Sequence, residues 1–232
     1  MGRAKEIIVK VIPTSEANSF VKKHHYSGKV VMNSVLHFGA FLDGKLHGVM
    51  SYGNPIDKRN VLPFVRGTKW NEMLELNRMA FDDYLPKNSE SRCIAISIRL
   101  IKKNAPHIKW ILSFSDGTQC GDGTIYRASG FSLCGINKNS TIYRLPNGET
   151  IAKHGTSKRD FTGATKLKGF QLRYLYFIDK KAKKNLTLPI IPFSKIDEIG
   201  AGMYKGEKIT LQERRAKESD KVDSNANSKL DA

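Results

Sequence analysis

Hydrophobic and polar positions recur along the chain with two periods, which predict strands and helices. Ile94, Ile98 and Ile101 recur at helical spacing and predict an amphipathic helix capped by Asn88 or Ser89. In chain order we expect a strand at 7–12, a helix at 14–25, strands at 36–42, 46–52 and 73–79, a helix at 89–104, a strand at 109–115, a short helix at 123–129, and strands at 131–135, 140–144 and 170–178.

An antiparallel start followed by a strand–helix–strand crossover predicts a mixed α/β sheet. Asp43-Gly44 between two apolar runs is typical of a hairpin turn. The order resembles that of GCN5-related N-acetyltransferases (GNAT): a mostly antiparallel central sheet flanked by helices. In that architecture a cofactor pyrophosphate lies at the N-terminus of the helix that here begins at Ser89. The glycine-rich turn (Q/R)xxGx(G/A) of that family is absent, so the sequence does not support a coenzyme A ester as donor.

The chain of 232 residues carries a net charge of +17, which indicates a polyanionic partner, most often nucleic acid. Residues 138–184 alone hold twelve basic and three acidic residues, whereas residues 213–232 are neutral overall. We expect a catalytic core at 1–135, a basic strand-rich extension at 136–212 that contacts DNA, and a disordered tail at 213–232. The candidate DNA-binding residues are Lys153, Lys158, Arg159, Lys166 and Lys168.

Composition also limits the cellular location. The three cysteines, Cys93, Cys120 and Cys134, are an odd number without a CxxC pair, which argues against a disulfide framework and favours a reducing compartment. No apolar stretch is long enough to span a bilayer, and the N-terminus lacks the apolar region of a signal peptide. We therefore expect a cytoplasmic protein that is not secreted.

Four segments contain residues that could carry chemistry. His25 and Tyr26 close the first helix and could relay protons or bind a metal, or simply face solvent. Arg78 lies in the strand at 73–79 and could bind an anion bidentately, or pair with Glu75 or Asp82. On a regular strand Arg78 would lie on the face opposite Glu75.

The other two segments lie after this strand. Ser89, Ser91 and Arg92 begin a helix, where they could bind an anion or only cap the helix. Asp116 follows a buried strand and could accept a proton from an attacking amine, with Tyr126 as general acid. The alternatives are a turn role for Asp116 and a packing role for Tyr126.

Together these segments resemble the Mom DNA-modification family of Mu-like phages. The resemblance rests on His25-Tyr26-Ser27, Glu75-Leu76-Asn77-Arg78, Ser91, Ser115-Asp116-Gly117 and Tyr126, with 176–179 and 188–194 later in the chain. It implies a GNAT-like transferase that adds a carbamoylmethyl group to adenine N6 in duplex DNA, in the host cytoplasm, and protects the DNA from host restriction. The implied functional residues are His25, Tyr26, Arg78, Ser91, Asp116 and Tyr126.

The resemblance also implies iron, for which His25, Tyr26, Asp116 and Tyr126 are compatible ligands. Arg78, Ser89, Ser91 and Arg92 would hold an anionic part of a donor whose identity stays open. Adenine N6 must lose a proton as it attacks, so a base is required, either Asp116 or His25. The buried base must also flip out of the duplex, and Tyr26 or Tyr126 could contact it there.

Two other functions remain open at this point. One is an acetyl-CoA-dependent N-acetyltransferase, which the missing glycine turn and the basic charge disfavour. The other is a non-enzymatic phage DNA-binding protein, for which no helix-turn-helix or zinc-finger spacing is present. Double-stranded DNA is the expected partner, no membrane is expected, and a homodimer is left open.

Overall fold

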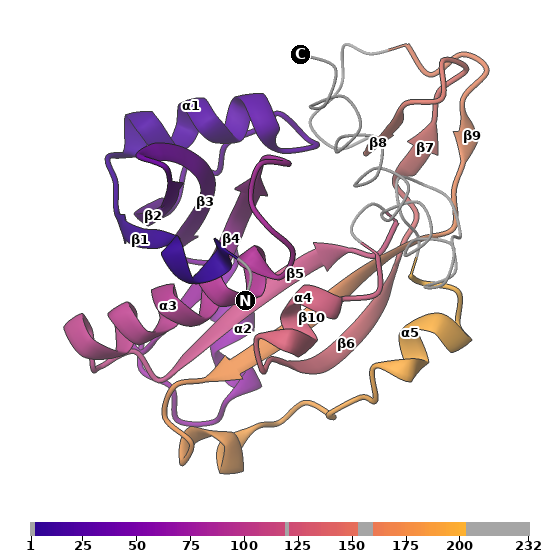
Figure 1. Cartoon of the computed structure of the whole chain (residues 1–232). Coiled ribbons are helices and arrows are strands. Elements are labelled where there is room, and N and C mark those ends of the chain that lie inside the picture. Colours follow the sequence, from indigo (N-terminus) through magenta and orange to yellow (C-terminus); the bar gives the residue numbers. More distant parts are fainter. Residues whose placement is uncertain (1–2, 119–120, 153–159, 203–232) are drawn as a thin grey trace.

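The computed structural model describes residues 3–118, 121–152 and 160–202, and its centre is a seven-stranded sheet (Figure 1). In spatial order the sheet contains β1 (Ile8–Val11), β2 (Ser34–Leu42), β3 (Lys45–Gly53), β4 (Met73–Phe81), β5 (Trp110–Asp116), β10 (Gly169–Phe177) and β6 (Ser132–Asn139). A second sheet contains β8 (Thr150–Ala152), β7 (Ile142–Arg144) and β9 (Thr165–Lys166). The helices are η1 (Arg3–Glu6), α1 (Thr14–His24), α2 (Lys58–Val61), η2 (Leu62–Phe64), α3 (Ser89–Asn104), α4 (Thr124–Ala128), η3 (Ala182–Asn185) and α5 (Ser194–Glu198).

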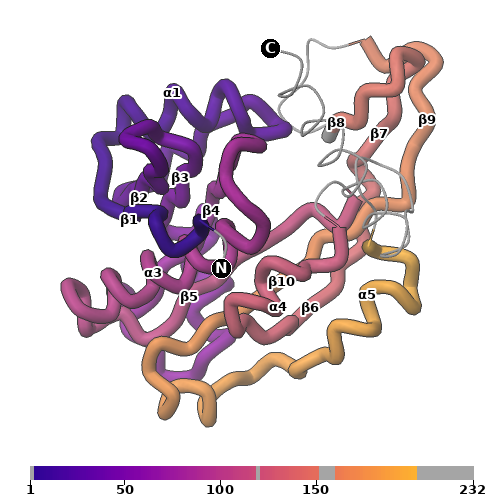
Figure 2. The backbone as a smooth tube through the Cα atoms, in the orientation of Figure 1, coloured from indigo at the N-terminus to yellow at the C-terminus, as the bar shows by residue number. Residues whose placement is uncertain are grey.

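One pair of strands, β4 and β5, is parallel, and all other neighbours in the large sheet are antiparallel. The mixed, mostly antiparallel sheet predicted from the sequence is therefore confirmed. The parallel pairing spans only Met73–Leu76 against Trp110–Ser113, although β4 continues to Phe81 and β5 to Asp116. Beyond Leu76 the two strands diverge, as the arrows of β4 and β5 show in Figure 1 and the tube of the backbone shows in Figure 2.

A β-bulge at Asn77 changes which side chains of β4 share a face. Leu76 pairs with Tyr52 and Arg78 pairs with the adjacent Ser51, so Asn77 is an extra residue on the β4 side. Side chains alternate along a strand and cross-strand partners share a face. Arg78 therefore lies on the same face as Glu75, and the expectation that they lie on opposite faces was wrong.

Different helices cover the two faces of the large sheet. On the α3 face, Tyr52 and Leu76 pack with Ile94 and Ile98, and the Tyr52 hydroxyl lies 2.6 Å from Ser97 Oγ. On the opposite face, called here the α1 face, two hydrophobic clusters lie side by side. One contains Ala17, Phe20, Val21, Val49 and Ala80, from α1, β3 and β4. The other contains Val61, Val65, Met73, Trp110 and Leu112, from α2, its neighbouring loop, β4 and β5.

The last strand of the large sheet comes from late in the sequence. β10 inserts between β5 and β6, and its Leu172, Tyr174 and Leu175 are fully buried. The expected division after residue 135 falls inside β6, so the large sheet contains strands from both sides of that division. Residues 213–232 and Cys120 lie outside the described residues.

Replacing Gly53 with Ala should destabilise the protein. A Cβ at Gly53 would collide with the backbone of Asn33 and Ser34, which cannot move as a flexible side chain could. We expect a loss of about 1–3 kcal/mol in the free energy of unfolding. Gly135→Ala is the matched control, because the atoms nearest to a Cβ there belong to the flexible side chain of Arg173, the first at 3.2 Å. An equal loss for both variants in urea unfolding would contradict the assignment of Gly53.

Candidate active site

His25 ends α1 and turns its imidazole toward the sheet. Its N–H donates to the Val21 carbonyl at 2.9 Å, and its backbone is already extended. Nδ1 accepts the backbone N–H of Ser27 at 3.1 Å and lies 2.8 Å from Ser27 Oγ. Burial, and then the charge of Arg78, lower the pKa of His25 to about 3. The ring is therefore neutral near pH 7 and carries its proton on Nε2, so His25 can donate a hydrogen bond but is poorly suited to act as the base.

Glu75 lies on the α1 face together with Arg78, at the point where β4 and β5 begin to separate. It pairs with Gly53 on one side and with Leu112 on the other, one position before the last parallel pair. Burial raises the pKa of Glu75 to about 7, and the charge of Arg78 limits the rise. A carboxyl group with a pKa near 7 can both accept and release a proton at neutral pH, which suits general base catalysis.

Glu75 was not expected to be a functional residue. In the segment around it, Arg78 was the expected functional side chain, as a group that binds an anion. The available signal was a carboxylate inside the otherwise apolar run Met73-Leu74-Glu75-Leu76, because a buried acidic side chain is rare unless it has a partner or a function. The bulge at Asn77, which brings Arg78 to the face of Glu75, has no comparable signal in the sequence.

Asp116 and Tyr126 lie on opposite faces of β5. Alternation along β5 puts Asp116 with Phe114 on the α1 face, and its Oδ1 accepts the backbone N–H of Thr118 at 2.8 Å. Tyr126 is buried on the α3 face, where its ring stacks on Tyr174 and its hydroxyl lies 3.0 Å from Ser113 Oγ. The structure thus places Asp116 on the face of Glu75 and separates it from Tyr126.

Tyr26 follows His25 and is 59% exposed, with its ring 4.2 Å from the His25 ring. Of the candidate DNA-binding residues, Lys166 and Lys168 are exposed, and Lys168 lies over the Phe170 ring. Lys153, Lys158 and Arg159 lie outside the described residues.

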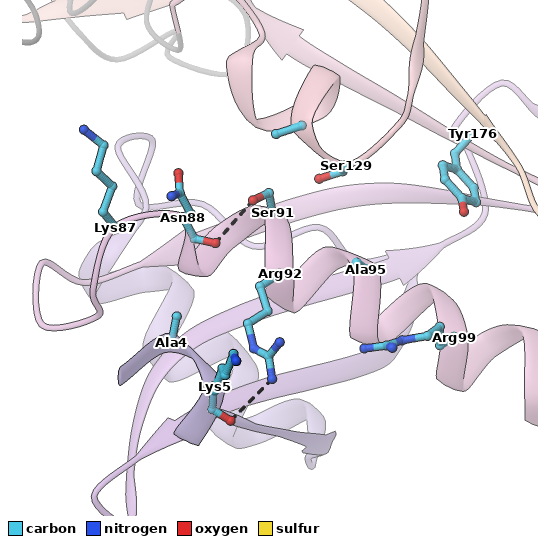
Figure 3. A pocket seen from close by; sticks show the side chains of 11 residues that line it. Ala4, Lys5, Lys87, Asn88, Ser91, Arg92, Ala95, Arg99, Ser129 and Tyr176 are labelled. Atoms are coloured by element: carbon cyan, nitrogen blue, oxygen red, sulfur yellow. Dashed lines mark hydrogen bonds between the residues drawn. The ribbon is translucent and has the colours of Figure 1, made fainter. Parts of the chain in front are cut away.

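A cavity of about 830 Å³ lies at the start of α3, between that helix, η1, α4 and β10 (Figure 3). Its lining contains four basic side chains and no acidic one: Lys5, Lys87, Arg92 and Arg99. Ser91 also lines it, and its hydroxyl donates to the Asn88 carbonyl at 3.2 Å. Such a concave basic surface suits phosphate or another polyanionic group.

The start of α3 has no side-chain cap, so the expectation that Asn88 or Ser89 caps it was wrong. Asn88 has a φ of 67° and makes no capping hydrogen bond, and Ser89 Oγ donates to the Pro86 carbonyl instead. The first-turn N–H groups therefore receive no acceptor from the Asn88 side chain, and the positive end of the helix dipole lies beside the basic cavity.

The predicted iron ligands do not form one cluster in this arrangement. Among the described residues, no group of three or more His, Cys, Asp or Glu side chains is placed to hold a metal ion. Tyr126 lies on the face of the sheet opposite Asp116, and its hydroxyl is packed against Ser113. Iron remains a prediction from the resemblance.

The comparisons with known proteins identify the family. A family model described as the Mom protein family matches residues 6–195. The methylcarbamoylase mom of Escherichia phage Mu is 34% identical over 197 residues, which are 79% of this chain and 80% of that protein. The chain belongs to the Mom protein family. The resemblance inferred from the segments around His25, Glu75, Ser91 and Asp116 is therefore confirmed.

Solved structures similar to this Mom family member include several acetyltransferases. A Bacillus subtilis acetyltransferase in complex with CoA is 13% identical, with a TM-score of 0.48 over 74% of this chain and 99% of that one. A GNAT family acetyltransferase from Elizabethkingia anophelis with acetyl-CoA bound is also 13% identical, with a TM-score of 0.49 over 74% and 98%. The ribosomal-protein-S18-alanine N-acetyltransferase of Escherichia coli is 11% identical, with a TM-score of 0.46 over 75% and 94%. In the described part of the chain, no helix has the length and apolar character of a membrane span.

Replacing Glu75 with Gln should remove a pH-dependent loss of stability. The pKa of Glu75 is about 7 in the folded state and 4.5 ordinarily, so the folded state holds a proton that the unfolded chain releases between these values. As pH rises from about 4.5 to 7, the free energy of unfolding of the wild type should fall relative to Glu75→Gln, by up to roughly 3 kcal/mol. Urea unfolding at pH 5 and pH 8 measures this difference.

The exposed Glu16 on α1 supplies the control. Glu16→Gln should keep the same stability difference from the wild type at both pH values. A constant difference for Glu75→Gln as well would show that Glu75 is not a buried carboxyl group that titrates near neutrality.

Proposed function

We propose that this protein is a phage DNA-modification enzyme that converts adenine in duplex DNA to N6-carbamoylmethyladenine and so protects the DNA from host restriction. The observation that carries the proposal is the 34% identity to the methylcarbamoylase of phage Mu over most of both chains. The net charge of +17 supports it, because Lys and Arg side chains neutralise the phosphates of a DNA backbone.

Glu75 is the proposed base. In the reaction, a bond forms between adenine N6 and the methylene carbon of the carbamoylmethyl group, the bond from that carbon to the rest of the donor breaks, and N6 loses a proton. The N6 lone pair is conjugated into the ring, so proton removal must accompany attack. The pKa of Glu75, about 7, and its place one position before β4 and β5 separate favour this role over Asp116, whose Oδ1 already accepts the Thr118 N–H.

Arg78 and His25 would support Glu75 from the same face. The charge of Arg78 lowers the pKa of Glu75 and so keeps a useful fraction of it ionised at neutral pH. Neutral His25 carries its proton on Nε2 and could donate a hydrogen bond to the substrate without competing as a base. Tyr26, beside His25 and largely exposed, could contact an adenine that has left the duplex.

The basic cavity at the start of α3 is the proposed site for an anionic part of the donor. Donor and adenine would then approach the divergence of β4 and β5 from opposite faces, the donor from the α3 face and adenine from the α1 face. An acetyl-CoA-dependent N-acetyltransferase is the second candidate, because the same cavity could take the pyrophosphate of coenzyme A. The mass of the adduct on the product distinguishes the two reactions.

Cells that express the wild-type chain should contain a carbamoylmethyl adduct on deoxyadenosine, and cells that express Glu75→Gln should not. Loss of a general base reduces a rate by about 100-fold or more. Nucleoside mass spectrometry of the cellular DNA measures the adduct, with western blotting to compare protein levels. An adduct at wild-type level in Glu75→Gln, together with its loss in Asp116→Asn, would assign the base to Asp116. DNA without any adduct from cells with soluble wild-type protein would contradict the proposed function itself.

Reversing the charge of Lys87 and Arg99 should weaken donor binding. Both side chains are exposed within the cavity, so glutamate at these positions would repel an anionic donor without disturbing the core. We expect the adduct to fall at least about tenfold in the double variant. Lys102→Glu/Lys103→Glu is the matched control, since it makes the same charge change on the exposed end of α3, outside the cavity. An equal effect of both double variants would instead indicate a general loss of attraction for DNA.

A further inference from the structure

Two apolar side chains beside the candidate active site project almost entirely into solvent. Met32 is 91% exposed and Ile56 is 93% exposed, the highest values among the large hydrophobic residues of the described chain. Met32 lies in the loop between α1 and β2, and Ile56 in the loop between β3 and α2. Nothing in the packing of the core requires either side chain to be large and apolar.

The two loops form one unit. The Asn33 side-chain amide donates to the Asn54 carbonyl, and the Asn33 backbone packs against Gly53 so closely that no Cβ fits there. Met32 precedes Asn33 and Ile56 lies two residues after Asn54, so both apolar tips are held near this contact. Met32 lies just before β2 begins, and Ile56 lies just after β3 ends. The two strands therefore restrict the movement of both side chains.

This unit borders the candidate active site. Ser34 pairs with Gly53, and Gly53 pairs with Glu75, so the two loops lead directly into the strand positions beside the proposed base. Ser34 Oγ also lies 2.8 Å from the side-chain oxygen of Asn77, the bulge residue. The loop with Met32 begins at His25 and Tyr26, on the same face of the sheet.

The chain segments that carry the two tips are mostly basic. Residues 22–35 and 54–70 contain seven Lys or Arg residues and a single acidic residue, Asp57. The basic residues are Lys22, Lys23, Lys29, Lys58, Arg59, Arg66 and Lys69. Exposed apolar tips on basic segments match a partner that is apolar inside and anionic outside, which describes the stacked bases and phosphates of duplex DNA.

We propose that Met32 and Ile56 form an apolar wedge that enters the base stack of duplex DNA and occupies the space left when the target adenine turns out toward Glu75. The wedge rests on the proposed function and goes further, because it assigns the opening of the duplex to two particular side chains. Flipping a base costs a few kcal/mol of lost stacking and pairing, and inserted apolar side chains recover part of that cost. The basic residues around the wedge bind the flanking phosphates.

The wedge predicts a selective defect on duplex DNA. Single-stranded DNA needs no wedge, because its bases are already accessible. In a lysate of the expressing cells, which contains the donor that those cells supply, Met32→Ser/Ile56→Ser should modify duplex DNA about 10- to 100-fold less than the wild type. On the same DNA after heat denaturation, the variant and the wild type should form amounts of adduct that agree within about twofold. Adducts per adenine are measured by mass spectrometry.

The control is Ile8→Ser/Ile190→Ser, which removes two exposed apolar side chains elsewhere on the surface and should match the wild type on both substrates. Equal activity of the wedge variant and the wild type on duplex DNA would overturn the wedge, and so would an equal loss on both substrates. A variant that modifies duplex DNA normally but loses binding to vesicles of anionic lipid would assign the two side chains to a membrane surface instead. Absence of any adduct with the wild type would count against the proposed function and is a distinct result.

A second measurement needs no donor. Duplexes with one 2-aminopurine between random flanking bases become more fluorescent when that base leaves the stack. The wild type should raise the fluorescence, and Met32→Ser/Ile56→Ser should raise it much less. The affinity of the variant for the duplexes should stay within about threefold of the wild-type affinity, because phosphate contacts dominate affinity. The same rise with the variant as with the wild type would contradict the wedge.

Discussion

The short parallel pairing between β4 and β5 is the constraint on which the site depends. Only four residue pairs hold the two strands together, and beyond Leu76 and Ser113 they diverge. Beyond this point the two strands no longer pair with each other. Glu75 lies one position before the last parallel pair, and its burial raises its pKa to about 7. The end of the pairing therefore places a carboxyl group that can exchange a proton near neutral pH beside the separating strands.

In the proposed reaction, the two faces of the sheet would serve donor and acceptor separately. The uncapped start of α3 adjoins a basic cavity on one face, whereas His25 and Arg78 lie on the other. The bulge at Asn77 brings Arg78 to the face of Glu75, and Asn77 also lies within hydrogen-bond distance of Ser34. Separate approaches to one centre would allow a donor and a large DNA substrate to be bound at the same time.

Local patterns in the sequence predicted most elements of the fold, and the failures have physical causes. Asp43-Gly44 predicted the hairpin because both residues adopt positive φ, and the spacing of Ile94, Ile98 and Ile101 predicted α3. The insertion of β10 between β5 and β6 was not predictable, because strand order depends on contacts between distant segments. The bulge at Asn77 is determined by the partner strand, and without it the shared face of Glu75 and Arg78 could not be derived. Asn88 fits a helix cap by residue type, but its left-handed backbone prevents it from capping.

In the proposed mechanism, adenine leaves the duplex and loses its N6 proton to Glu75, beside the point where β4 and β5 separate. The decisive measurement is a crystal structure of the Glu75→Gln variant bound to duplex DNA that contains a target adenine. We expect a flipped adenine on the α1 face, with N6 about 3 Å from the side chain at position 75. An adenine that stays stacked in the duplex, or one whose N6 lies at Asp116 and away from position 75, would contradict it.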